Sequence, residues 1–330
     1  MARAEKSPRI SVVMSAYNAA DYLDEAITSI LTQTFEDFEF IIIDDGSSDE
    51  TNGIISDYAR RDARVKLVTQ KKNQGLIAAL NLGFKLARGQ YIARMDADDV
   101  SLPERFQREY DYLESHPDAV IVGTQAVFID EKSKTTGFEP FLLDDEEIRT
   151  EIMIRNKQFR HGAVLIRHSL ITRYGELYDP QAVHYEDFEY WPRLLRHGTC
   201  ANLPEVLYLY RQSQTSLTAT KKDEMRVGTD SVMERERAAA SLPRFRTRQV
   251  IDAFHKATSY RPSRITVGGK HMRTGLRWLY QSYLFGLSKL YAGRGEYMSA
   301  AFVMAASFLL NPARYVMAIV DVTYHRVFPE

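Results

Sequence analysis

The chain has 330 residues, of which 45% are hydrophobic and 26% are charged. This composition supports a folded core and excludes global disorder, and the length suffices for one large domain or for one domain with a substantial appendage. The 43 basic and 44 acidic residues leave a formal net charge of −1, so the whole chain has no electrostatic attraction to nucleic acid. The single cysteine, Cys200, excludes a disulfide framework and a cysteine-rich metal site.

The first two-thirds of the sequence alternate between short apolar runs and amphipathic stretches. Such apolar, β-branched runs are typical of strands buried on both faces of a parallel sheet, whereas helical spacing of apolar residues predicts a surface helix. Strands are predicted at 10–14, 40–43, 65–69, 90–93, 119–129, 163–166 and 204–210. Helices are predicted at 19–34, 49–60, 76–88, 103–115 and 187–197. The alternation predicts an α/β fold, in which right-handed βαβ units build a mostly parallel sheet flanked by helices.

The character of the sequence changes at about residue 216, after which no further strand is predicted. A Ser- and Thr-rich stretch at 212–220 predicts a loop, and we expect one domain at 1–215 and a helical region at 216–330. Helices are expected there at about 222–240, 246–257, 271–292 and 296–309.

The predicted helical region carries a strongly basic segment at 241–277, with nine Lys or Arg residues and one acidic residue. Aromatic helices follow it, together with an apolar run at 298–310 that is too short to cross a bilayer. This combination predicts binding to an anionic membrane surface. Because the N-terminus shows no secretory signal, the expected location is cytoplasmic, peripheral on the inner face of the plasma membrane. Packing of the helices on the first domain, or as the interface of a homo-oligomer, is the alternative.

Polar side chains follow three of the predicted strands. Ser15 and Tyr17 come after the first strand, Asp44 and Asp45 after the second, and a cluster of three aspartates at 96–99 after the strand at 90–93. The carboxyl ends of parallel strands share one edge of a sheet, where ligands of such folds bind. Clustered carboxylates repel one another unless a cation compensates, and they are natural ligands of Mn²⁺ or Mg²⁺. The alternative is a solvated acidic turn that caps the following helix.

These motifs, in this order, resemble the family 2 inverting glycosyltransferases of bacterial polysaccharide type. The likeness rests on ISVVMSAYN, on IIIDDGSSDET and on NQGLIAALNLGFKLARGQYIARMDADD, and it covers roughly residues 8–215. It implies the Rossmann-like GT-A fold and a metal-dependent hexosyltransferase. The enzyme would move a sugar, with UDP-sugar as the expected donor, to a hydroxyl of a glycan or lipid-linked acceptor in surface polysaccharide biosynthesis.

The resemblance also implies roles for individual residues. Asp187, the aspartate of a Glu-Asp pair, would be the catalytic base, and Asp98 would bind the Mn²⁺ or Mg²⁺ ion on the donor diphosphate with Asp96 beside it. The residues that we expect to bind the nucleotide-sugar, on the resemblance or, for Arg94, on the departure from it described below, are Ser15, Tyr17, Asp45, Asn73, Asn81, Arg94 and Asp96. His161 and Glu186 are expected on the acceptor side; a structural histidine, and an acidic first turn of the helix at 187–197, are the alternatives.

The sequence departs from the family pattern in two places. Many members carry an Arg-Asn pair where this chain has Leu80-Asn81, and we expect Arg94 to supply the missing positive charge near the diphosphate. Members often end the core with Tyr-Arg-x-His, the histidine assisting at the metal, but Ser213 occupies that position here. A third protein ligand of the metal is therefore left open.

Other functions fit the sequence less well. A nucleotidyltransferase or a dehydrogenase would need a glycine-rich phosphate loop after the first strand, and SAYNAADY contains no glycine. A catalytically lapsed scaffold that binds nucleotide-sugars in a membrane assembly is the main alternative, although the retained Asp96, Asp98 and Asp187 favour an enzyme. Nucleic acid is not an expected partner, because the aromatic helices beside the basic segment suit lipid better than bases.

Overall fold

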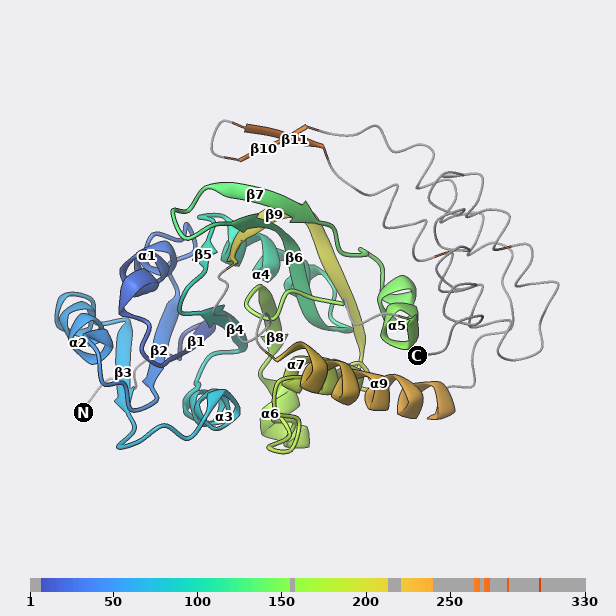
Figure 1. Cartoon of the computed structure of the whole chain (residues 1–330), viewed down its shortest axis with the longest axis horizontal. Helices are drawn as coiled ribbons and strands as arrows, with labels where there is room; N and C mark the ends of the chain where they lie inside the picture. The colour runs from blue at the N-terminus through green and yellow to red at the C-terminus, as the bar shows by residue number, and fades with distance from the viewer. Residues whose placement is uncertain are drawn as a thin grey trace, which may run out of the picture. The chain divides into compact units, whose positions relative to one another are not determined.

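The computed structural model describes residues 7–154, 158–212, 221–239, 264–267 and 270–273, together with Leu284 and Val303. The chain divides into two compact units (Figure 1). The first comprises Met1–Ile152 and Asn156–Arg235, and the second comprises Met153–Arg155 and Glu236–Glu330. The domain boundary predicted near 212–220 falls largely on residues outside the described ranges and stays a prediction.

The first unit is built on one mixed sheet. Its strands are β1 (Ile10–Ala16), β2 (Phe38–Asp44), β3 (Val65–Thr69), β4 (Tyr91–Asp96), β5 (Val100–Ser101), β6 (Ala119–Ile129), β7 (Thr135–Glu139), β8 (Val164–Arg167) and β9 (Thr199–Arg211). They pair in the order β3-β2-β1-β4-β8-β6-β9-β5, with β7 on β6. β3, β2, β1 and β4 are parallel, as are β6 and β9, whereas β5, β7 and β8 are antiparallel to their neighbours. The predicted mixed, mostly parallel sheet is confirmed.

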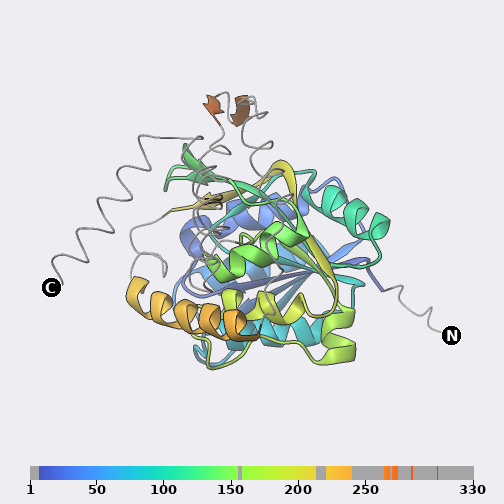
Figure 2. The ribbon, with the colours of Figure 1, turned by 90° about the vertical axis from the view of Figure 1, so that its right-hand side faces the viewer.

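Helices lie on both faces of this sheet (Figure 2). They are α1 (Ala20–Leu31), α2 (Thr51–Arg61), α3 (Leu76–Leu86), α4 (Arg105–Ser115), α5 (Asp145–Ile154), α6 (Ser169–Tyr174), α7 (Glu186–Leu194) and α9 (Lys222–Ala239). The strands and helices predicted before residue 216, and the helix at 222–240, are confirmed within a few residues at most ends. The short elements β5 and α6, and the elements β7 and α5, were not predicted from the sequence.

The alternation of side chains along a strand assigns each residue of β1 to one face of the sheet. Val12 and Met14 belong to a core that includes buried residues of α1 and α4. Val13 points to the opposite face, where α3 packs closely enough that a Cβ at Gly83 would lie 2.4 Å from Val13 Cγ1. A glycine in this helix therefore allows the close approach of α3 to the sheet.

The second unit contains a described hairpin, which corrects one sequence prediction. β10 (Arg264–Val267) and β11 (Lys270–Arg273) pair antiparallel, with Arg264 opposite Arg273. The prediction that no strand follows residue 216 is therefore wrong, and so is the helix expected from 271 in its first turn. The Gly268-Gly269 pair is a sequence signal for a two-residue hairpin turn that helical periodicity outweighed in the prediction. The helices expected at 246–257 and 296–309, and most of the one at 271–292, lie outside the described residues.

The pairing of the parallel strands positions the functional site. Ser15 of β1 is opposite Asp96 of β4, and Ala16 is opposite Asp44 of β2. The polar residues that follow β1, β2 and β4 thus share one edge of the sheet, as the sequence predicted.

Candidate active site

Asp45 is a buried carboxylate that holds the loop after β3. Its Oδ1 accepts the backbone N–H of Gln74 at 2.9 Å and the side-chain amide of Gln70 at 2.8 Å, and its Oδ2 accepts the backbone N–H of Gly75 at 2.8 Å. Gly75 has a φ of 92°, which a residue with a side chain rarely adopts. The loop therefore depends on both the Asp45 carboxylate and this glycine for its path.

The loops that follow β1 and β2 are joined to each other by short polar side chains. Asn18 accepts the backbone N–H of Ser48 at 2.9 Å, and the hydroxyl of Ser47 accepts the backbone N–H of Asn18 at 3.0 Å. Beside them Ser15 is half-buried and Tyr17 is 49% exposed. Tyr17 is thus an exposed aromatic ring on a fixed loop, available to stack on a flat ligand.

The two asparagines expected to bind the donor lie in different surroundings. Asn73 is exposed in the loop that Asp45 holds, and its Oδ1 accepts the N–H of Gly75 at 2.9 Å. Asn81 of α3 forms two hydrogen bonds with the backbone of Tyr178: it donates to the carbonyl oxygen and accepts from the N–H, both at 2.9 Å. The side-chain amide of Asn81 therefore ties α3 to the loop before α7, and a role for either asparagine at the donor stays a prediction.

Arg94 and Asp96 form a buried ion pair at the end of β4. Arg94 is 1% exposed, whereas Asp96 and Asp98 are half-buried. Burial, together with the negative charge of Asp96, raises the pKa of Asp98 to about 6. The positive charge of Arg94 therefore only partly offsets the repulsion within this carboxylate cluster.

Two residues of β9 that the sequence prediction missed complete this end of the sheet. The guanidinium Nε of Arg211 donates to the carbonyl oxygen of Asp98, and its backbone N–H donates to Asp99 Oδ1, both at 2.7 Å. The hydroxyl of the buried Tyr208 accepts the backbone N–H of Asp96 at 3.4 Å. Arg211 is the arginine of the Tyr-Arg-x-His motif with which family members often end the core. The sequence indicated this motif, but only the replacement of its histidine by Ser213 entered the prediction.

Glu186 and Asp187 are the first two residues of α7. The Oδ1 atom of Asp187 accepts the backbone N–H of Phe188 at 2.7 Å. Burial raises the pKa of Asp187, while the Phe188 N–H and the charge of Arg94 act in the opposite direction. Burial and the neighbouring Asp187 raise the pKa of Glu186 to about 7. Both carboxylates can therefore hold a proton more readily than an exposed acid.

His161 lies against this acidic pair. Its Nδ1 is 3.8 Å from Glu186 Oε1, and its Nε2 is 2.8 Å from the hydroxyl of Tyr178. Burial lowers the pKa of His161 well below its usual value, and the charges of Arg94 and Arg160 act in the same direction. The imidazole is consequently neutral at physiological pH and serves as a hydrogen-bonding group.

The charge of Arg94 acts on residues from both halves of the predicted site. It forms the ion pair with Asp96, partly opposes the rise in the pKa values of Glu186 and Asp187 that burial causes, and adds to the lowering of the pKa of His161. The structure thus brings Asp96, Asp98, His161 and the Glu186-Asp187 pair around one buried guanidinium. Ser15, Tyr17, Asp45 and Asn73 lie farther along the same sheet edge, beyond β4.

The carboxylates at the end of β4 suit a hard divalent cation. Carboxylate oxygen is the ligand type that Mg²⁺ and Mn²⁺ prefer, and Asp98 lies partly buried beside the negative charge of Asp96. Within the described ranges, no group of three His, Cys, Asp or Glu side chains could hold a metal ion by itself. Asp98 and Asp96 therefore fit an ion whose remaining ligands are substrate phosphates and water.

A scan of family models decides what kind of protein carries this arrangement. The model of glycosyl transferase family 2 matches residues 11–175, which include the ends of β1, β2 and β4. The chain belongs to glycosyltransferase family 2. This confirms the resemblance predicted from the sequence, and with it the enzyme class, a glycosyltransferase.

Relatives among characterised and uncharacterised proteins agree with this assignment. An uncharacterised glycosyltransferase of Haemophilus influenzae is 33% identical over 217 residues, which are 63% of this chain and 66% of that protein. The amylovoran biosynthesis glycosyltransferase AmsE of Erwinia amylovora is 31% identical over 204 residues, which are 61% of this chain and 75% of that protein.

Two solved structures share the fold. Staphylococcus aureus TarS 1–349, in complex with UDP-GlcNAc, matches with a TM-score of 0.58 and 14% identity over 93% of this chain and 87% of that one. The mannosyltransferase PcManGT of Pyrobaculum calidifontis, in complex with GDP-Man and Mn²⁺, matches with a TM-score of 0.53 and 14% identity over 98% of this chain and 82% of that one. The predicted GT-A fold is thereby confirmed.

Proposed function

We propose that this glycosyltransferase is an inverting, metal-dependent enzyme that moves a sugar from a nucleoside diphosphate donor, with UDP-sugar as the first candidate, to a hydroxyl of a glycan or lipid-linked acceptor. The observation that carries the proposal is the position of Arg94. Its buried guanidinium pairs with Asp96, and its charge also acts on Glu186 and Asp187, where it partly opposes the rise in their pKa values. This arrangement supports a site in which carboxylates at the diphosphate and a proton acceptor lie around one positive charge.

The donor nucleotide binds along the edge formed by β1, β2 and the loop after β3. Tyr17 stacks on the base, and Asp45 fixes the loop that carries Asn73. UDP-GlcNAc and GDP-Man in the two structural neighbours support a nucleoside diphosphate sugar as donor, and they leave the choice between uridine and guanosine to experiment.

Asp98 and Asp96 would hold the divalent ion, with Mn²⁺ or Mg²⁺ as candidates, and the Mn²⁺ of the PcManGT complex supports this expectation. The ion, when bound, neutralises charge that develops on the leaving diphosphate. Two arginines of this chain support the carboxylates that would hold the ion. Arg94 limits the repulsion between the carboxylates, and Arg211 holds the carbonyl oxygen of Asp98 and the carboxylate of Asp99.

Asp187 takes the proton from the acceptor hydroxyl as this oxygen attacks the anomeric carbon of the donor sugar. The bond from the anomeric carbon to the diphosphate oxygen breaks as the new glycosidic bond forms on the opposite face, which inverts the configuration. One carboxylate is enough for this reaction, because no covalent sugar intermediate has to form. The raised pKa of Asp187 suits a base, since a base with a pKa closer to the working pH accepts protons more effectively.

Binding of UDP in the presence and absence of Mn²⁺, followed by calorimetry, tests the donor half of the proposal. The full chain should bind UDP more tightly with Mn²⁺, and Asp98→Asn should remove that difference. Asp111→Asn, a substitution at an exposed position of α4, is the matched control and should bind like the wild type. If Mn²⁺ increased UDP affinity equally in all three proteins, Asp98 would not be a ligand of the ion.

The acceptor and the location are proposed from the sequence and from AmsE, a relative named for amylovoran biosynthesis. We place the enzyme in surface polysaccharide synthesis at an anionic membrane surface, to which the basic segment 241–277 binds. None of the helices within the described ranges is long and apolar enough to cross a membrane. Sedimentation of the full chain with vesicles of phosphatidylglycerol, and with neutral phosphatidylcholine vesicles as the control, tests this binding. Failure to sediment with either kind would reject the membrane role.

A further inference from the structure

Helix α9 lies outside the region matched by the family model and contacts the helix that carries Glu186 and Asp187. Glu224 Oε2 of α9 is 3.2 Å from Nε2 of His184, which precedes α7 by two residues. About three turns further along, Arg235 of α9 is 3.5 Å from Glu189 of α7. The later residue of α9 thus pairs with the later residue of the α7 segment, so the two helices lie side by side and run in the same direction.

Between these polar pairs the helices approach closely. A Cβ at Gly228 would lie 2.2 Å from the ring of Tyr185, the residue immediately before α7. Val232, one turn beyond Gly228, is 3% exposed. Glu224, Gly228, Val232 and Arg235 recur at helical spacing and thus share one face of α9. This face, defined by those four residues, is the α7-facing side of α9.

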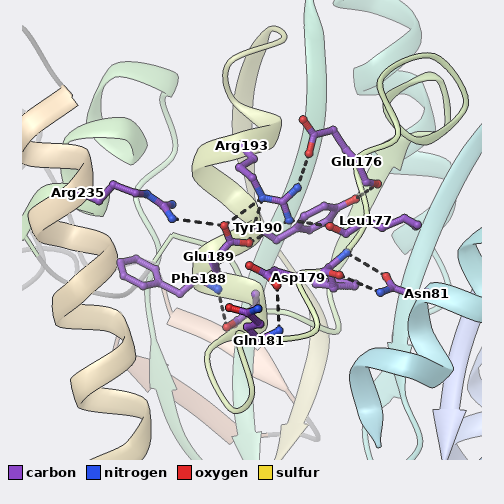
Figure 3. A network of polar contacts seen from close by, with 12 residues as sticks. Asn81, Glu176, Leu177, Asp179, Gln181, Phe188, Glu189, Tyr190, Arg193 and Arg235 are labelled. Carbon is purple, nitrogen blue, oxygen red and sulfur yellow. Dashed lines mark hydrogen bonds and ion pairs between the residues drawn. The ribbon is translucent and has the colours of Figure 1, made fainter. Parts of the chain in front are cut away.

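The contact at Glu189 continues into the loop before α7 (Figure 3). Glu189 is buried and accepts hydrogen bonds at 3.0 Å from Arg193, whose Nη2 also donates to the carbonyl oxygen of Leu177 at 2.6 Å. The next residue, Tyr178, has its backbone held by Asn81 and its hydroxyl next to His161. A continuous chain of contacts therefore runs from Arg235 to the histidine that faces Glu186.

The chain enters α7 through an uncommon conformation. His184 has a φ of 74°, in the left-handed region that residues other than glycine seldom occupy. Such a conformation persists only where the surroundings hold it in place. The contact of His184 with Glu224 and the packing of Tyr185 on Gly228 are two such restraints, and they act directly before Glu186.

We propose that α9 is a positioning element for the Glu186-Asp187 pair, with Glu224 and Arg235 as its positioning residues. The helix holds α7 at the entry, through His184 and Tyr185, and one turn into the helix, through Glu189. This inference rests on the proposed function only in giving Asp187 the role of base. It adds a second helix to the catalytic unit from the part of the chain beyond the matched region, in which α7 itself lies.

The test compares variants of the full chain on the two sides of α9. Arg235→Gln and Glu224→Ala remove the two polar contacts with α7, and Arg235→Lys restores a charge at the first of them. Arg226→Gln and Asp223→Ala are the matched controls, because both side chains are largely exposed, at 69% and 97%. The measurements are the rate of UDP release from UDP-GlcNAc, the Kd of UDP with Mn²⁺, and amide hydrogen exchange over residues 184–190.

A misplaced catalytic group costs rate without costing donor affinity. We expect Arg235→Gln and Glu224→Ala to lower the rate of UDP release by about tenfold or more. The Kd of UDP should stay within about twofold of the wild type, because the donor nucleotide binds at another part of the sheet edge. Exchange over 184–190 should be faster than in the controls, and Arg235→Lys should recover part of the rate.

Two results would overturn the inference: rates and exchange equal to those of the control variants, or a parallel loss of rate and of UDP affinity, as general destabilisation would produce. Failure of the proposed function looks different, because the wild-type chain would then bind neither UDP nor GDP. In that case amide hydrogen exchange over residues 184–190 alone tests whether α9 positions α7. Equal exchange in Arg235→Gln and Arg226→Gln would overturn the inference.

Discussion

The guanidinium of Arg94 pairs with the carboxylate of Asp96 two residues along the same strand. Side chains at i and i+2 of a strand point to the same face, so the Arg-Met-Asp sequence of β4 places the two groups together. The intervening Met95 points to the opposite face and belongs to the hydrophobic core. The strand thereby places one buried positive charge in a site whose other charged side chains are mostly carboxylates.

Replacement of Arg94 should impair both the fold and the donor site. In Arg94→Gln the carboxylates lose their buried counter-charge, and we expect the free energy of unfolding to fall by about 3 kcal/mol, since removal of one partner from a buried ion pair is strongly destabilising. UDP binding should weaken as well. Urea denaturation and calorimetry measure the two effects, with Lys85→Gln, an exposed position of α3, as the control. Stability and UDP affinity equal to those of Lys85→Gln would contradict the role of Arg94.

Asp45→Asn should release the loop after β3. One carboxylate oxygen becomes an amide donor, although three donors, including the N–H groups of Gln74 and Gly75, point at this side chain. An unsatisfied buried group costs about 1–3 kcal/mol, so we expect a loss of roughly 2 kcal/mol in stability and at least tenfold weaker UDP binding. The control Asp57→Asn changes an exposed carboxylate of α2. UDP affinity that is unchanged in Asp45→Asn would show that neither Asp45 nor its loop contacts the nucleotide.

Gly162 keeps the loop before β8 close to the end of β4. A Cβ at this position would lie 2.1 Å from the hydroxyl of Tyr208 and 2.8 Å from Asp96 Oδ2. Gly162→Ala should therefore displace the donor site and destabilise the protein by about 1–3 kcal/mol. In Gly53→Ala, on α2, the new methyl group meets its nearest neighbour at 3.7 Å, so this variant should be neutral or slightly stabilised. Thermal denaturation and UDP binding that do not differ between the two would refute the close contact.

The pH dependence of stability should report on Glu186. Its pKa rises from 4.5 to about 7 on folding, so the folded state holds a proton that the unfolded state releases between these values. The stabilising protonated form is fully present below pH 4.5 and is lost as the pH rises through 7. Because the glutamine does not titrate, the free energy of unfolding of Glu186→Gln should rise relative to that of the wild type by about 1–3 kcal/mol between pH 5 and pH 8. Thermal denaturation at both pH values measures this, and a constant difference between the two proteins would show that the Glu186 pKa is not raised.

Elements dominated by local periodicity could be predicted from the sequence, and details fixed by tertiary contacts could not. The start of α2 is an example. Ser48 and Asp49 are residue types that commonly cap a helix, but α2 begins after Glu50, and the side chain of Glu50 makes no capping hydrogen bond. Asp49 instead accepts N–H groups from Thr51 and, across the sheet edge, from Ala20 of α1. A contact between loops 29 residues apart thus competed with the local signal.

The same limit applies to the site. The aspartates at the strand ends could be predicted, because the end of an apolar run marks where they lie. Their partners could not: Gly75 is 30 residues from Asp45, and Arg211 is 113 residues from Asp98. Asn81 is a similar case: its expected role at the donor stays a prediction, but the hydrogen bonds of its amide with the backbone of Tyr178, 97 residues away, could not be predicted. Only the pairing of α3 with the loop before α7 explains this use.

The most direct test of the proposed mechanism is the transfer rate of Asp187→Asn, measured as UDP release in the presence of acceptor, beside the Kd of UDP. Loss of a general base removes about 10²–10⁴ of the rate, and the nucleotide makes no use of this carboxylate. We therefore expect the rate to fall by at least about a hundredfold while the Kd of UDP stays within about twofold. Asp118→Asn, at an exposed position before β6, is the control and should keep both values. A rate in Asp187→Asn equal to that of Asp118→Asn would contradict the account.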